Sequence, residues 1–468
     1  MNNAGLVQWC MAALLALLLP RAAAAQSVWE LTPYRVLFAV WTADLPEFTP
    51  LWQQDLRQNL VQHADATFGP AWETSTADCP ADISLAALSL AENIPAKALP
   101  SEWLNAYDKL IVVRVAAADE GYDVRTREFD LTSQLWSPPR DTSAAAPSSV
   151  SIEAFRSAVR GFAPLAKVEQ IAGKEVILQL RAAALPPRDG SVQLVPPQAV
   201  YRPVIRFNDR DGNAKRIQPI EWTFLVAQSQ EGNAVTCSVE SGLRNPLVSR
   251  VRGRTQQLAL TVLPPREPTT LTLISRVDPK IRLPGFDVWV HPADIKTTTL
   301  LGKTDRFGAI IIPPPPLDEP QLRILLIKNG AEVVAKLPVM PGLFARLEAT
   351  LSDDQERLAL EGFITGLQEE LVDTVAQREV LAALIHARVQ KGEKAEAEKL
   401  LADLRALKTR DQFLGLLTER RKTIENKDPR VQRQIDKLFS DTQKVLNQHL
   451  DLKQIEDAAA EVAGMAAK

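Results

Sequence analysis

The spacing of apolar residues changes along the chain, and its first part alternates between the periods of strands and helices. An apolar run at residues 34–40 predicts a strand. Thr49-Pro50 follows, an N-cap with proline in the first turn, so a helix should begin there. A second apolar run at 109–116 predicts another strand, followed by a turn and a returning strand of alternating apolar and charged residues. Residues 30–164 are therefore expected to form a small α/β domain.

The next two segments have the short apolar runs of β-structure. Within residues 165–262 these runs are separated by clusters of turn residues, which predicts a small β-barrel or sandwich of about five to seven strands. Leu263-Pro264-Pro265 then marks a boundary. Residues 266–348 hold further apolar runs around a turn, and this pattern predicts a second β module, a sandwich.

The last part of the chain, residues 352–456, has the three- and four-residue spacing of helices. Ser352 and Gln355 form a capping-box pattern ahead of its first apolar stripe. The further predicted helix starts lie after Gly392, at Thr409 and at Asp428-Pro429. The segment predicts a helical hairpin or bundle, so the fold class expected for the whole chain is multidomain α+β.

The first residues have the pattern of a secretory signal peptide. Residues 6–19 form an apolar run that is too short to span a membrane, and it ends at Pro20. Small residues at 22–25 fit a cleavage site, so we expect residues 1–25 to be removed before Gln26. No later run approaches about 18 apolar residues. The sequence thus predicts a periplasmic or secreted protein that does not span the membrane after cleavage.

Two parts of the pattern resemble known assembly domains. The strand 108–112 with the returning segment 122–132 resembles the central hairpin of the α/β domains in curli-secretion and flagellar T-ring proteins. Val168, Gly173 and the apolar run 176–178 are similar to the opening of the small barrel that follows such a domain in the flagellar protein. This resemblance implies an α/β domain joined to a barrel, in a protein of cell-envelope assembly.

The segment 266–348 resembles a different module. Its order of strand, turn and strand, with Thr-Asp-Arg-Phe-Gly at 304–308 as the turn, is similar to the transthyretin-like (carboxypeptidase-regulatory-like) sandwich of many secreted proteins. That resemblance implies a spacer or a binding scaffold and brings no catalytic residues. The chain as a whole resembles a secreted bacterial family, which implies architecture and no activity.

Charge is balanced overall but uneven between segments. The net charge is −3, which gives no reason to expect a nucleic-acid partner. Residues 27–150 carry 8 basic and 17 acidic side chains, whereas residues 151–265 carry 15 and 9. This asymmetry predicts that the two segments pack together, or that the basic one has a surface partner. The basic segment holds a cluster of arginines, which is either a solvated β face or a site for an acidic envelope polymer: Arg244, Arg250, Arg252 and Arg254.

Motifs for catalysis or for a bound metal are not evident. The four histidines are far apart in sequence: His63, His291, His386 and His449. Gly302-Lys303-Thr304 ends like a phosphate-binding loop, but Thr297 stands where its first glycine belongs. Cys79 and Cys237 are expected as two buried thiols, although a pair is permitted in an oxidising compartment. We therefore expect no cofactor, no metal site and no catalytic residue.

Three hypotheses remain for the function. The first is an exported, non-enzymatic structural or assembly protein of the cell envelope, whose C-terminal helices bind envelope proteins. The second is a module that binds a glycan or an acidic polymer through the arginine cluster and tryptophans such as Trp41, Trp52, Trp136, Trp222 and Trp289. The third is an enzyme whose site is assembled from residues distant in sequence.

Overall fold

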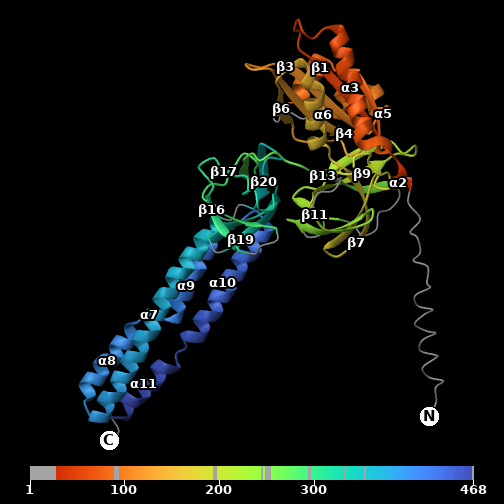
Figure 1. Ribbon diagram of the computed structural model, residues 1–468. Coiled ribbons are helices and arrows are strands. Elements are labelled where there is room, and N and C mark those ends of the chain that lie inside the picture. Colours follow the sequence, from red (N-terminus) through yellow and green to blue (C-terminus); the bar gives the residue numbers. More distant parts are fainter. Residues whose placement is uncertain are drawn as a thin grey trace, which may run out of the picture.

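The computed structural model describes residues 28–88, 94–192, 198–243, 246–247, 254–293, 297–330, 332–352 and 355–465. The predicted signal peptide therefore lies outside the described residues. Four units follow one another along the chain: an α/β domain, a closed β-barrel, a β-sandwich and a long helical arm (Figure 1). The predicted fold class, multidomain α+β with β modules and a helical C-terminal region, is confirmed.

The α/β domain is built on a six-stranded sheet of order β2-β1-β3-β4-β5, in which β6 also pairs with β4. The predicted strands β1 and β3 lie at its centre, pair in parallel and bury both faces, as their continuous apolar runs require. The strands are β1 (Tyr34–Thr42), β2 (Trp72–Asp78), β3 (Lys109–Ala117), β4 (Tyr122–Asp130), β5 (Leu135–Trp136) and β6 (Arg140–Ala144).

Helices cover both faces of this sheet. Val36 and Phe38 of β1 pack with α3 and α6, whereas the alternate residues Leu37 and Ala39 pack with α4 and α5. The Thr49 hydroxyl accepts the Trp52 N–H at 3.2 Å, which confirms the predicted start of α3. The helices are α2 (Val28–Leu31), α3 (Pro50–Phe68), α4 (Ala81–Ala87), α5 (Ser101–Ala106) and α6 (Val150–Gly161), with short 3-10 turns at Gly69–Ala71, Ala96–Ala98 and Pro147–Ser149.

The second unit is a barrel, which decides between the two predicted β architectures. Six strands close in the order β9-β11-β12-β8-β7-β13, because β13 pairs with both β7 and β9, and β10 pairs with β9 outside the ring. The strands are β7 (Leu165–Ala172), β8 (Glu175–Leu180), β9 (Val200–Asn208), β10 (Ala214–Pro219), β11 (Thr223–Glu231), β12 (Ala234–Ser241) and β13 (Thr255–Val262).

The acidic α/β domain and the basic barrel pack together, as their charges predict. Leu165, Val204 and Leu258 of the barrel lie in one apolar core with Phe162 and Val36 of the α/β domain. The contact is therefore a continuous buried core and not an electrostatic association of two surfaces.

The third unit is the predicted β-sandwich, made of a three-stranded sheet β17-β14-β20 and a four-stranded sheet β16-β15-β18-β19. Its core joins Leu271 and Leu273 of one sheet to Leu325 and Ile327 of the other. The strands are β14 (Thr269–Ser275), β15 (Asp287–Pro292), β16 (Thr299–Lys303), β17 (Ala309–Ile312), β18 (Arg323–Asn329), β19 (Glu332–Val339) and β20 (Arg346–Leu351).

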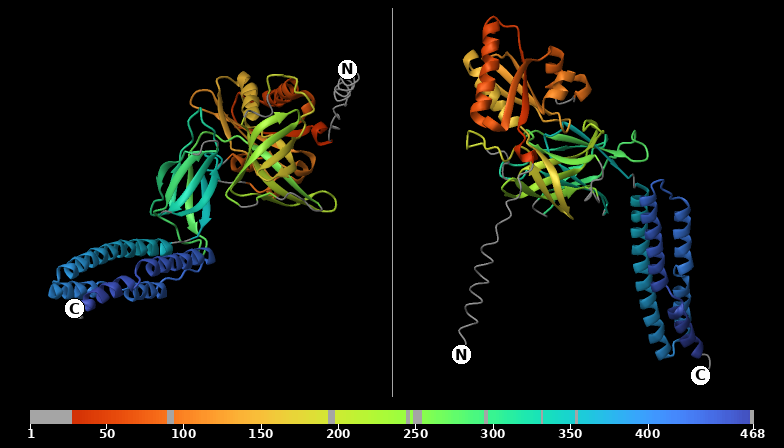
Figure 2. Two further views of the ribbon diagram at one scale, coloured as in Figure 1. Left: turned by 90° about the horizontal axis from the view of Figure 1, so that it is seen from below. Right: turned by 90° about the vertical axis from the view of Figure 1, so that its right-hand side faces the viewer.

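The helical arm, residues 355–464, projects from the sandwich away from the α/β domain (Figures 1 and 2). Its 37-residue helix α7 is about 55 Å long at 1.5 Å per residue. The first half of α7 packs with α9 and α10, and the second half packs with α8 and α11. The helices are α7 (Gln355–Lys391), α8 (Lys394–Ala406), α9 (Arg410–Lys422), α10 (Pro429–His449) and α11 (Lys453–Gly464).

Two of the predicted helix starts in the arm are confirmed in detail. Thr409 and Gln412 form a capping box, and the Asp428 carboxylate accepts the Arg430 N–H at 2.8 Å. The fifth helix, α11, was not predicted, and it ends at Gly464 rather than near residue 456. Within the described part of the chain, no helix is both long and apolar enough to cross a membrane.

Candidate functional site

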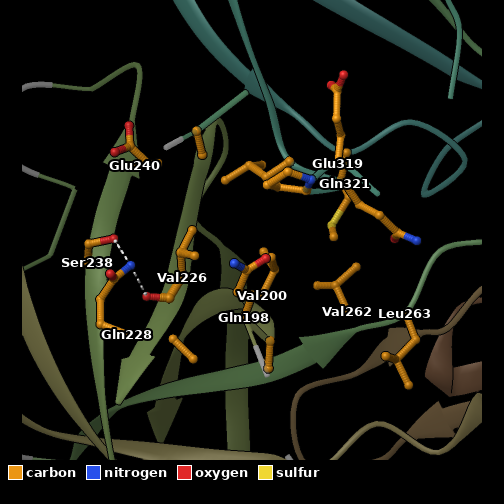
Figure 3. A pocket seen from close by; sticks show the side chains of 16 residues that line it. Gln198, Val200, Val226, Gln228, Ser238, Glu240, Val262, Leu263, Glu319 and Gln321 are labelled. Carbon is orange, nitrogen blue, oxygen red and sulfur yellow. Dashed lines mark hydrogen bonds between the residues drawn. The ribbon is translucent and has the colours of Figure 1, made fainter. Parts of the chain in front are cut away.

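A cavity of about 690 Å³ lies between the barrel and the sandwich (Figure 3). The ends of β9 and β13 and the facing parts of β11 and β12 form its barrel side, and the loop before β18 forms its sandwich side. Apolar side chains cover most of the wall. The polar side chains in the wall are those of Gln198, Gln228, Ser238, Glu240, Glu319 and Gln321.

The two carboxylates of this wall already have cationic partners. Glu240 pairs with Lys336 of the sandwich at 3.0 Å, and Glu319 pairs with Arg323 at 2.6 Å. The Lys336 contact also crosses the boundary between the two domains. Because both acids are paired, the wall presents no uncompensated carboxylate to a ligand.

The amides of the wall are the groups available for binding. The Gln228 amide donates to Ser238 Oγ at 3.0 Å and to the Val226 carbonyl at 3.3 Å (Figure 3). In the described structure, the side-chain amides of Gln198 and Gln321 have no hydrogen-bond partner. An amide offers both donors and an acceptor, so this cavity suits a neutral ligand with amide or hydroxyl groups and an apolar body.

The backbone is strained where Gln198 enters the wall. Its φ of 56° lies in the left-handed region, which costs a residue with a side chain on the order of 1 kcal/mol or more. Such strain persists where the surrounding structure fixes the residue. The conformation thus holds the Gln198 amide at the mouth of the barrel.

A second polar cluster lies between the α/β domain and the barrel, and it is closed to solvent. Lys109 Nζ lies 2.7 Å from Glu128 and 2.9 Å from Asp130, and it donates to the Ala163 carbonyl. The three charged side chains are at most 2% exposed. Burial alone would lower the pKa of Lys109, but the carboxylates of Asp130 and Glu128 raise it above its usual value. A cluster with so little exposure supports the domain joint and is out of reach of a substrate.

The predicted arginine site is only partly described. Arg244, Arg250 and Arg252 lie outside the described residues. Arg254 is exposed next to β13, and its carbonyl accepts the Asn208 N–H at 2.9 Å. Arg254 does not line the cavity between the barrel and the sandwich.

The five named tryptophans are half-buried and serve in local packing. Trp52 stacks on Phe48 with ring centroids 4.1 Å apart, and Trp222 packs against the core of the sandwich. Trp41, Trp136 and Trp289 lie against the cationic groups of Arg114, Arg127 and Lys328. The position of each of these tryptophans is therefore explained by packing within its own part of the fold.

Cys79 and Cys237 are both buried and free, as the sequence predicts. Burial raises the pKa of each thiol to about 12, so neither is a reactive thiolate near neutral pH. Across the described residues, no group of three or more His, Cys, Asp or Glu side chains is arranged to hold a metal ion.

The cavity residues gave no signal in the sequence. Gln228 and Ser238 occupy neighbouring strands of the barrel, where polar residues at alternate positions are typical of a solvated face. They become a wall because the sandwich packs over the mouth of the barrel, through Leu322 and Met340 against Val200. Residues that meet only at a contact between two domains leave no periodic pattern in the sequence, so the cavity could not be predicted from it.

No protein-family model matches the sequence, and no curated protein matches it. Among solved structures, the chain is similar to TolB from Acinetobacter baumannii, with 12% identity and a TM-score of 0.15, over 69% of this chain and 96% of that one. It is also similar to the Bacillus anthracis TIE protein, with 11% identity and a TM-score of 0.15, over 44% of each chain. BcpA, the major pilin subunit of Bacillus cereus, has 9% identity and a TM-score of 0.14, over 53% of this chain and 71% of that one. With scores of this size, the function has to be argued from the residues of the chain itself.

Proposed function

We propose that the protein is an exported, non-enzymatic structural or assembly protein of the cell envelope that acts through protein–protein contacts. The helical arm carries this proposal. Helix α7 runs through both helical cores, and its outer face exposes apolar side chains to solvent: Val372 (66%), Val380 (59%) and Leu384 (44%). Exposed apolar groups along a projecting helix suit a protein partner.

The joints between the domains support a structural role. Arg181 of the barrel pairs with Asp108 of the α/β domain at 2.7 Å, and Lys336 of the sandwich pairs with Glu240 of the barrel. At the base of the arm, the buried Arg357 donates to the Asn329 carbonyl of the sandwich at 2.8 Å. Each junction between domains is thus stabilised by a polar contact. A chain whose domains are fixed in this way can hold two partners at a constant separation.

The test is the double variant V372E/V380E in the full-length exported protein. These exposed positions tolerate a charge, so the variant should fold, but it should lose co-purification with envelope proteins after cross-linking in the native envelope. I311E is the matched control, because it charges an exposed apolar residue of the sandwich. If both variants keep every partner and the same mass in solution as wild type, the arm is not the binding surface.

A second candidate is a ligand-binding module, and the cavity between the barrel and the sandwich favours it over an enzyme. The sixteen described residues that line the cavity offer amides, one hydroxyl and two paired carboxylates, and no histidine or cysteine is among them. These groups bind a polar ligand by hydrogen bonding more readily than they transfer protons. An acidic polymer on the arginines around Arg254 remains a further proposal.

A further inference from the structure

A basic pocket of about 510 Å³ adjoins the cavity between the barrel and the sandwich, where the α/β domain meets them. The two share Leu263 and Gln321 in their walls. Arg140 of β6 and Arg160 of α6 enter the pocket from the α/β domain. The linker 263–266 forms the opposite wall, with two prolines and Arg266.

Arg140 and Arg160 line the same pocket, and their charges act on each other. The side chain of Arg140 passes along Gly161, where an added Cβ would lie 3.4 Å from Arg140 Cγ. Arg140 Nη2 donates to the Leu263 carbonyl, but its Nε is buried without a hydrogen-bond partner. No ion pair engages Arg140 or Arg160 within the described residues. Burial, with the charge of Arg160 as a second cause, lowers the pKa of Arg140.

The other charged groups of the pocket are already engaged. Asp141, its one described carboxylate, accepts from Arg125 Nη2 at 2.8 Å and from Arg125 Nε. Arg266 is fixed by donating to the carbonyls of Pro315 and Leu317, at 2.8 and 3.2 Å. The pocket therefore has an excess of positive charge, and neither Arg140, which donates to the Leu263 carbonyl, nor Arg160 is neutralised by a carboxylate.

We propose that this pocket binds the dianionic phosphate group of a small ligand, with Arg140 and Arg160 as its cationic partners. Guanidinium groups match the oxygen geometry of phosphate, and two negative charges balance the two unpaired arginines. The remaining volume, beside Leu263 and the two prolines, accommodates an apolar group attached to the phosphate. The proposal does not depend on the function proposed for the arm.

Isothermal titration of the full-length protein at constant ionic strength tests this site, with inorganic phosphate and phenyl phosphate as probes. Wild type should bind in a saturable manner, and R160Q should weaken the affinity about tenfold or more, because a charged hydrogen bond is lost. R156Q is the matched control: it removes the same charge one turn earlier on α6, from a surface pair with Glu153 at 2.8 Å. It should leave the affinity unchanged.

Two results would overturn the proposal: no saturable binding of either probe to wild type, or an equal loss of affinity in R160Q and R156Q. The ratio of the two affinities distinguishes the sources of the phosphate. Tighter binding of phenyl phosphate assigns the site to an organic phosphate ligand, and equal binding assigns it to free phosphate. In both cases a loss of affinity in R160Q, with none in R156Q, identifies Arg160 as a partner of the phosphate.

Discussion

Lys109 is a charged residue without exposed surface, and its surroundings explain how the first two domains stay together. The carboxylates of Glu128 and Asp130 face the Lys109 ammonium group. This group also donates a hydrogen bond to the carbonyl of Ala163, next to the first strand of the barrel. A buried pair of this kind is costly to form but more costly to break, because one partner is then left as an uncompensated charge. The cluster therefore fixes the position of the joint.

Above pH 7, where Glu128 is ionised, replacing Lys109 with Met should lower the free energy of unfolding of the α/β domain by about 3–5 kcal/mol, because Glu128 and Asp130 lose their cation while still buried. Urea denaturation followed by tryptophan fluorescence would measure the change. Lys97→Met, at an exposed position, should stay within about 0.5 kcal/mol of wild type. A Lys109→Met protein as stable as wild type would contradict this account.

Glu128 should give the joint a pH dependence. Burial raises the pKa of Glu128 from 4.5 to about 7, against the opposing effect of Lys109. Between these pH values the folded chain retains a proton that the unfolded chain has released, so the free energy of unfolding falls as the pH rises. In Glu128→Gln this fall between about pH 5 and 7 should be smaller by about 1–3 kcal/mol. Denaturation curves at the two pH values give the free energy of unfolding at each. An equal change between the two pH values in the variant and in wild type would refute the prediction.

At the scale of elements, the sequence was sufficient to place the start of a helix wherever a capping side chain marks it. Thr49, Thr409 and Asp428 cap the helices that they were expected to cap. Helix α11 was missed because the apolar side chain of Leu452, at its N-cap, cannot accept a hydrogen bond from the helix. Arg140 and Arg160 were missed as a site because they are 20 residues apart on a strand and a helix, and only the tertiary fold brings them together.

Arg378 explains how one long helix serves two helical cores. It is buried in the middle of α7, and its guanidinium donates to the carbonyls of Lys408 at 3.1 Å and Asp451 at 3.5 Å. These carbonyls lie in the two loops, between α8 and α9 and between α10 and α11, where the partner helices are interrupted. The Arg378 side chain therefore supplies hydrogen-bond donors to backbone carbonyls in both loops, at the level of the arm where its two apolar cores meet.

Arg378→Met should destabilise the arm by about 1.5–3 kcal/mol, since the partly buried hydrogen bonds to the Lys408 and Asp451 carbonyls lose their charged donor. Hydrogen exchange should accelerate in both loops while the sandwich stays protected. Arg388→Met changes another arginine of α7 and removes its surface pairs with Glu393 and Glu396 at the start of α8, so it should leave exchange in these loops unchanged. Acceleration confined to one loop would mean that Arg378 does not join the two cores.

At the scale of the molecule, the charge asymmetry left two alternatives, and the structure shows one of them, the packing of the α/β domain against the barrel, through an apolar core. Tyr34 of the α/β domain accepts the Leu165 N–H of the barrel at 2.9 Å inside the shared apolar core. Asp108 is held by Arg35 and by Arg181 of the barrel, which keep the pKa of its carboxyl low although burial alone would raise it. Buried pairs are screened little by salt.

The radius of gyration of the full chain should therefore stay constant when salt is raised from 0.1 to 1 M, although the Debye length falls from about 10 Å to about 3 Å. Small-angle X-ray scattering at several salt concentrations would measure it. An expansion at high salt would mean that surface charge, and not the buried core, holds the domains together.

The nested order of the arm has a consequence for how the chain folds as it is synthesised. Helix α7 comes first in the arm, but the apolar stripe on its first half is covered by α9 and α10. The apolar core around its second half also needs α11, the last helix. When a polypeptide emerges from its N-terminus, earlier domains fold first. The α/β domain and the two β modules can thus fold while α7 is still uncovered, and the arm is complete only after its last helix has been synthesised. In that interval the apolar stripe of α7 is exposed, and we expect that it would then aggregate or bind a chaperone unless the later helices follow quickly.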